Sequence, residues 1–133
     1  MVHSLSFDEL ISYDSGVPGI TLKVEIKLGT TSVEIEAKVD TGSTFCVFQR
    51  SVAEMLGIDI EAGEPKRVST MTGSFNVFGH TATLITESFE FDSEIHFAVD
   101  EGFHKNILGR RGWLDKVVLG INDYDGKLYL SKH

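Results

Sequence analysis

Residues 20–43 read ITLKVEIKLGTTSVEIEAKVDTGS. Within Ile20–Leu28, apolar residues alternate with Thr, Lys and Glu, which is the pattern of a strand with one buried and one exposed face. The alternation resumes over Val33–Val39, and Gly29-Thr30-Thr31 offers a turn between the two segments. The stretch therefore predicts a β-hairpin whose second strand ends at Asp40.

The rest of the chain is also rich in short strand patterns. We expect further strands at Thr44–Phe48, Arg67–Met71, Phe75–Thr86, Glu94–Val99, Val117–Ile121 and Lys127–Leu130. Two short helices are expected. Ser51–Leu56 has a capping box of Ser51 with Glu54 and a stop at Gly57, and Arg110–Lys116 is weakened by Gly112. Many short strands with little helix predict an all-β fold, a closed or nearly closed barrel.

Length and composition restrict the class of protein. A chain of 133 residues predicts one domain spanning residues 1–133. Its net charge of -8 argues against a nucleic-acid partner, and no apolar run is long enough to cross a membrane. Met1–Ser4 lacks the pattern of a secretory signal, and the single Cys46 cannot form an internal disulfide. We therefore expect a cytoplasmic protein.

Two segments could carry chemistry. Asp40-Thr41-Gly42-Ser43 follows a strand directly, between Val39 and the apolar run Phe45–Phe48. It could be an ordinary turn, with Asp as a cap and Gly supplying a positive φ, but a carboxylate between two buried strands needs partners or a function. The second segment is Asn106-Ile107-Leu108-Gly109-Arg110. Both segments are much less expected to occur together by chance than either one alone.

In these two motifs and their order the sequence resembles the retropepsin-like aspartic peptidases, the single-lobe, retroviral-type relatives of pepsin. In that family a strand ends in Asp-Thr/Ser-Gly, a flap hairpin follows, and an apolar-apolar-Gly strand leads into a short helix. Val68–Val77 is similar to the flap, with Gly73 near its tip. The resemblance covers about Ile20–Leu130 and leaves residues 1–19 as an N-terminal extension of uncertain structure.

The resemblance implies an endopeptidase that needs neither a metal nor a cofactor and acts on peptide or protein substrates. Because the chain holds one Asp-Thr-Gly, it implies a homodimer in which Asp40 of each copy is catalytic. Thr41 would bond across the dimer axis, the Gly42 carbonyl would accept a substrate amide, and the Ser43 hydroxyl would donate to Asp40. Thr72, Gly73 and Ser74 would form the flap tip, and Gly109 and Arg110 would support the catalytic loop.

The sequence departs from the family pattern at Thr44, where retroviral members usually carry an acidic residue that pairs with the Arg of Gly-Arg. Two other interpretations stay open. The chain could be a dimeric retropepsin-like module that binds peptides or acts as a scaffold without cutting, or a monomeric all-β domain with a coincidental Asp-Thr-Gly. A nucleophilic dyad of Cys46 with a histidine is disfavoured, because a cysteine within Phe-Cys-Val-Phe is typical of a core. The histidines have no zinc-site spacing.

Overall fold

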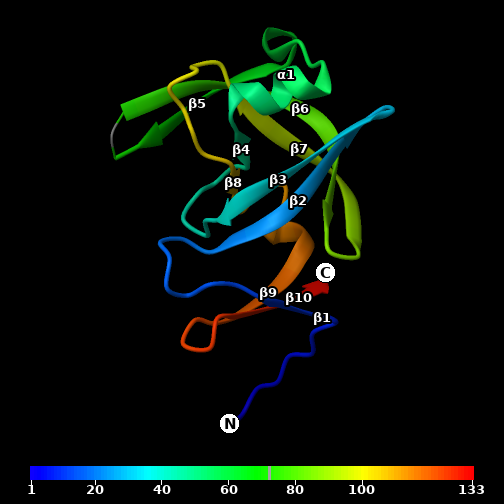
Figure 1. Cartoon of the computed structure of the whole chain (residues 1–133), viewed down its shortest axis with the longest axis vertical. Helices are drawn as coiled ribbons and strands as arrows, with labels where there is room; N and C mark the ends of the chain where they lie inside the picture. Colours follow the sequence, from blue (N-terminus) through cyan, green and yellow to red (C-terminus); the bar gives the residue numbers. More distant parts are fainter. Residues whose placement is uncertain (72) are drawn as a thin grey trace.

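A ring of strands forms the body of the protein. The computed structural model describes residues 1–71 and 73–133. The larger sheet contains β2 (Thr21–Leu28), β3 (Thr31–Val39), β4 (Val47–Phe48), β5 (Glu64–Thr70), β6 (Gly73–Thr86), β7 (Phe89–Ala98) and β8 (Ile107–Leu108). Its order is β2-β3-β8-β4-β7-β6-β5, and β2 also pairs with β6, so the sheet closes on itself (Figure 1). The predicted all-β barrel is confirmed.

The hairpin of β2 and β3 forms as its alternation predicts. The antiparallel register runs from Thr21 opposite Lys38 to Leu28 opposite Thr31, and Gly29 turns with φ of 61°. The inward side chains of β2, such as Val24 and Ile26, are fully buried, whereas the intervening residues face outward. One buried face is what fixes the register of such a hairpin.

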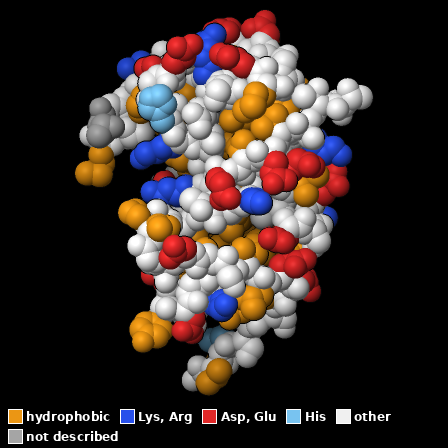
Figure 2. Space-filling model, viewed as in Figure 1, with side chains coloured by type: hydrophobic (Ala, Val, Ile, Leu, Met, Phe, Trp, Pro, Cys, Tyr) orange, Lys and Arg blue, Asp and Glu red, His pale blue; other side chains and the backbone are white. Residues whose placement is uncertain are grey.

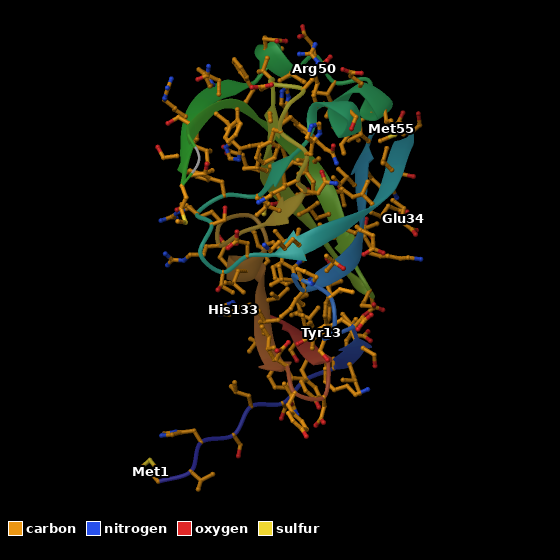
Figure 3. All side chains as sticks on the ribbon, turned by 60° about the vertical axis from the view of Figure 1, so that its left-hand side comes forward. Met1, Tyr13, Glu34, Arg50, Met55 and His133 are labelled. Atoms are coloured by element: carbon orange, nitrogen blue, oxygen red, sulfur yellow. The ribbon has the colours of Figure 1, made fainter. Side chains whose placement is uncertain are left out.

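A second sheet, of three strands, lies at the lower end of the molecule in Figure 1. Its order is β1 (Glu9–Ser12), β10 (Lys127–Lys132) and β9 (Val117–Asn122). The strand β1 belongs to the segment whose structure the sequence left uncertain, and it exists because Glu9 pairs with Leu130 across almost the whole chain. Figure 3 shows the end at Met1 extending away from the body.

The helix α1 (Arg50–Leu56) confirms one expected helix but not its start. Gln49 is the N-cap and makes no side-chain capping bond, so the predicted capping box of Ser51 with Glu54 is wrong. Arg50 instead donates from Nε to Glu54 Oε1 at 2.9 Å. The stop at Gly57 is confirmed, since this residue is left-handed with φ of 72°. A single turn, η1 (Ile60–Ala62), follows.

The expected helix at Arg110–Lys116 is wrong except for its last turn, η2 (Leu114–Lys116). Gly112 has φ of 100°, outside the helical region, and its N–H donates to Asp115 Oδ1 at 3.0 Å. Several predicted strands also have different bounds. Only Val47–Phe48 of the expected Thr44–Phe48 is a strand, and β7 begins at Phe89 instead of Glu94.

Two hydrophobic clusters fill the interior. The larger joins both sheets, with Leu128 and Leu130 of β10 packed among residues of the ring. Trp113 lies in it fully buried and donates from Nε1 to Thr86 Oγ1 at 3.1 Å. The smaller cluster lies near the hairpin of β5 and β6 and comprises Val47, Val77, Ala98 and Phe103 with Phe45, Val68, Phe75 and Ile107 packed against them. Among the described residues, no helix has the length and apolar character required to cross a membrane.

Candidate active site

Parallel pairing of β3 with β8 positions the loop Asp40–Ser43. Asp40 donates its N–H to the carbonyl of Leu108 at 3.0 Å, directly after the last paired residue of β3. Within the loop, Gly42 N–H donates to Asp40 Oδ1 at 3.0 Å, and Ser43 N–H donates to the Asp40 carbonyl at 3.1 Å. The aspartate is half-buried, while Thr41 and Gly42 are exposed. A backbone hydrogen bond within the loop thus orients the Asp40 carboxylate.

The segment after β8 docks on this loop through its backbone. Arg110 N–H donates to the Ser43 carbonyl and Arg111 N–H to the Thr44 carbonyl, both at 2.8 Å. The approach requires a glycine, because a Cβ on Gly109 would lie 2.2 Å from the Phe45 carbonyl oxygen and 2.8 Å from that of Ser43. Gly109 therefore supports the loop by allowing close contact between two stretches of backbone.

Cys46 is a structural partner in the same contact. Gly109 N–H donates to its sulfur at 3.3 Å, and the thiol lies 3.5 Å from the carbonyl oxygen of Arg111. Burial raises the pKa of the Cys46 thiol to about 12, so the group stays protonated at neutral pH. A protonated, fully buried thiol is a poor nucleophile, which agrees with its assignment to the core.

One predicted side-chain role differs in the structure, and Arg110 lacks an ion-pair partner as expected from Thr44. The Ser43 hydroxyl donates to the Phe45 carbonyl at 2.7 Å and not to Asp40. Ser43 therefore holds the backbone that leaves the loop and does not contact the carboxylate of Asp40. Arg110 is exposed, and within the described residues its side chain has no hydrogen bond or ion pair. The absence of an acidic residue at Thr44 leaves the guanidinium without the partner that the family pattern supplies. The contribution of Arg110 to the loop is its backbone N–H.

The segment Val68–Val77, predicted to be a flap, lies in the hairpin of β5 and β6. Thr70 pairs with Gly73, where φ is 146°, and Ser74 pairs with Ser69. Thr72, predicted at the tip, lies outside the described residues. The hairpin and the loop after β3 project to the same side of the molecule (Figure 1). The surface outline is notched between them (Figure 2).

The smaller apolar cluster joins these two segments. Val68 and Phe75 come from the hairpin, Phe45 lies between the loop and β4, and Ile107 belongs to β8, which pairs with β3. Phe75 and Phe103 make an edge contact with ring centroids 5.1 Å apart. The hairpin therefore packs against the segments next to the Asp40 loop, through side chains that lie outside the loop itself.

Sequence reasoning missed the surroundings of Phe45. The centroid of the Phe45 ring lies 4.9 Å from the centroid of the His96 imidazole. Lys66 Nζ lies 4.6 Å from the centroid of the Phe45 ring. These residues meet because β4 pairs with β7, with Val47 opposite His96. No local pattern could have indicated the contact, since the residues are far apart in sequence. Among residues 1–71 and 73–133, no group of three or more His, Cys, Asp or Glu could hold a metal ion.

Comparison with known proteins agrees with this geometry. Residues 22–122 match the family described as Aspartyl protease. A search of curated proteins gives no significant match. A retropepsin-like aspartic protease from Rickettsia conorii superposes with a TM-score of 0.66 at 18% identity, covering 97% of this chain and 96% of that one. The EIAV protease complexed with the inhibitor HBY-793 gives a TM-score of 0.58 at 17% identity, covering 75% and 88%. The chain has the retropepsin-like fold and belongs to the aspartyl protease family.

Proposed function

We propose that the protein is an aspartic endopeptidase that acts as a homodimer, with Asp40 of each copy contributing to one active site. The observation that carries this proposal is the Asp40–Ser43 loop. It is anchored by backbone hydrogen bonds to Leu108 and Arg110, yet it leaves the Asp40 carboxylate half-exposed beside a hairpin. A structural turn would need the anchoring but not an accessible carboxylate.

Peptide hydrolysis by this route needs two carboxylates about 3 Å apart that share one proton. The ionised carboxylate removes a proton from a water molecule, which attacks the scissile carbonyl carbon, while the protonated one donates to the carbonyl oxygen. One chain supplies a single Asp-Thr-Gly, so the second carboxylate comes from a second copy across a two-fold axis. Because like charges at this distance cannot both ionise cheaply, the pair titrates in two coupled steps.

The neighbours of Asp40 take supporting roles in the proposed dimer. The exposed Thr41 faces the matching loop of the other copy, and the exposed Gly42 lets a substrate backbone approach its carbonyl. The hairpin of β5 and β6, with Gly73 and Ser74 at its tip, closes over the bound peptide and excludes water.

The second candidate is a dimeric retropepsin-like module that binds peptides without cutting them. Arg110 favours this candidate. In retroviral family members the corresponding arginine pairs with an acidic residue, whereas within the described residues the Arg110 guanidinium has no ion pair. An intact Asp40 disfavours it, because a binding module has no need to bring two carboxylates together in its interface. The two candidates differ in whether Asp40→Asn abolishes an activity.

The test is cleavage of a diverse peptide pool from about pH 4 to pH 7, with products identified by mass spectrometry. The wild type should cut with a bell-shaped dependence on pH and should be blocked by a statine-type transition-state analogue. Asp40→Asn should lose cleavage while it keeps the same sedimentation coefficient and circular dichroism spectrum. A wild-type dimer that cuts nothing would support the binding module, and an inactive monomer would contradict the shared-site mechanism.

A further inference from the structure

A small hollow opens beside Phe45, next to the Asp40 loop. It has a volume of about 260 Å³ and lies between β5, β7 and the segment that leads into η2. Pockets for drug-sized ligands run from roughly 300 to 1,000 Å³, so this hollow suits a single side chain. Phe45 is bridged to Arg111 immediately beyond the loop, and Lys66 belongs to the proposed flap hairpin. The hollow therefore adjoins the path of a peptide held between loop and hairpin.

Positive charge predominates in its lining. Lys66, Arg111 and Lys116 face it, and none of the three is in an ion pair within the part of the chain that the structure describes. Of its two carboxylates, Asp115 already accepts the Gly112 N–H. Glu94 has a side chain 54% exposed and thus largely hydrated. The lining thus holds three cationic side chains against two carboxylates, an excess of one positive charge.

The inner wall holds an unsatisfied histidine. His96 is 2% exposed, and neither Nδ1 nor Nε2 has a hydrogen-bond partner among the described residues. Its nearest acid, Glu94 Oε1, lies 3.7 Å from Nε2, too far for a hydrogen bond. Burial lowers the pKa of His96, so the ring is neutral and carries one N–H that can donate. Native proteins seldom leave such a buried group unpaired unless a ligand or water completes it.

We propose that this hollow is a specificity subsite that selects an acidic side chain of the peptide substrate. Lys66 and Arg111 donate charge-assisted hydrogen bonds to the carboxylate, and the His96 N–H completes its coordination once the half-buried Phe45 ring turns aside. The inference rests on the proposed peptidase function. The overall charge of -8 repels acidic peptides at long range, so a preference for them can arise only from a local site.

Cleavage profiles of the peptide pool test the subsite. We expect the wild type to favour Glu or Asp over Gln or Asn by roughly tenfold or more at one fixed position from the cleaved bond. Lys66→Gln and Arg111→Gln should each lower the ratio of cleavage of acidic peptides to cleavage of neutral peptides, measured within the same variant so that a change in overall activity cancels. The matched control is Lys23→Gln, which removes the same charge from an exposed lysine on β2 and should change nothing. Cleavage without an acidic preference, or a preference that both variants retain, would overturn the proposal.

A binding measurement separates failure of the subsite from failure of the peptidase. Immobilised Asp40→Asn protein is exposed to the same pool, and the retained peptides are sequenced. Retention enriched in acidic peptides, and lost in Asp40→Asn/Lys66→Gln, supports the subsite even if the wild type cuts nothing. Equal retention of acidic and neutral peptides refutes it, whatever the outcome for cleavage.

Discussion

Replacing Gly109 with alanine tests how the candidate site is assembled. The φ of this glycine is not in the left-handed region, so space rather than backbone conformation excludes a side chain. The added Cβ would lie 2.2 Å from the Phe45 carbonyl oxygen, about 1 Å inside van der Waals contact. The contacting atoms are backbone, so one of the two segments must move. That movement weakens the bonds from Arg110 to Ser43 and from Arg111 to Thr44.

Overpacking at a rigid position costs about 1–3 kcal/mol, and loss of the two hydrogen bonds adds about 1 kcal/mol each. We therefore expect Gly109→Ala to lower the free energy of unfolding by about 3–5 kcal/mol. Urea unfolding at fixed protein concentration measures it, because a dimer makes the midpoint depend on concentration. Gly16→Ala is the control, since its nearest contact is the movable Asp14 side chain and its φ is ordinary. A Gly109→Ala protein within about 0.5 kcal/mol of the wild type would refute this reasoning.

Three further predictions concern buried polar groups. Trp113→Phe leaves the buried Thr86 hydroxyl unpaired and should cost about 2–3 kcal/mol in urea unfolding, part of which Thr86→Val should restore. Burial lowers the pKa of His96 below its ordinary value of 6.5, so the unfolded chain binds the proton first as the pH falls. Stability should then decline from about pH 6.5 downward, and a decline of the same steepness in His96→Gln would exclude His96 as its cause. Because burial raises the pKa of Cys46 to about 12, iodoacetamide at pH 8 should alkylate the folded protein far more slowly than the unfolded one, and equal rates would contradict the buried position.

The sequence predicts the parts of the fold that depend on local patterns. The alternation of apolar residues in β2 and β3 is a property of neighbouring residues, so the hairpin and the position of Asp40 at its end follow directly. The docking of Ile107–Arg110 on the loop could be predicted only through the family resemblance, because the pairing of β3 with β8 joins residues far apart in the chain.

The parts that escaped prediction depend on distant contacts or on one dihedral angle. The strand β1 is short and forms only because β10 lies beside it. The helix expected at Arg110–Lys116 fails because Gly112 adopts a positive φ, where a Cβ would also approach the Ser93 hydroxyl to 2.7 Å. His96 gave no signal in the sequence, since its burial against Phe45 arises from the pairing of β4 with β7.

The most direct test of a site shared between two copies is subunit mixing. Wild-type and Asp40→Asn proteins are combined at fixed total concentration, allowed to exchange subunits, and assayed on a peptide that the wild type cuts. If each active site needs Asp40 from both copies, activity should follow the square of the wild-type fraction and fall to about a quarter in an equal mixture. Activity that falls in direct proportion, to about a half, would show that one chain carries the whole site and would contradict the account.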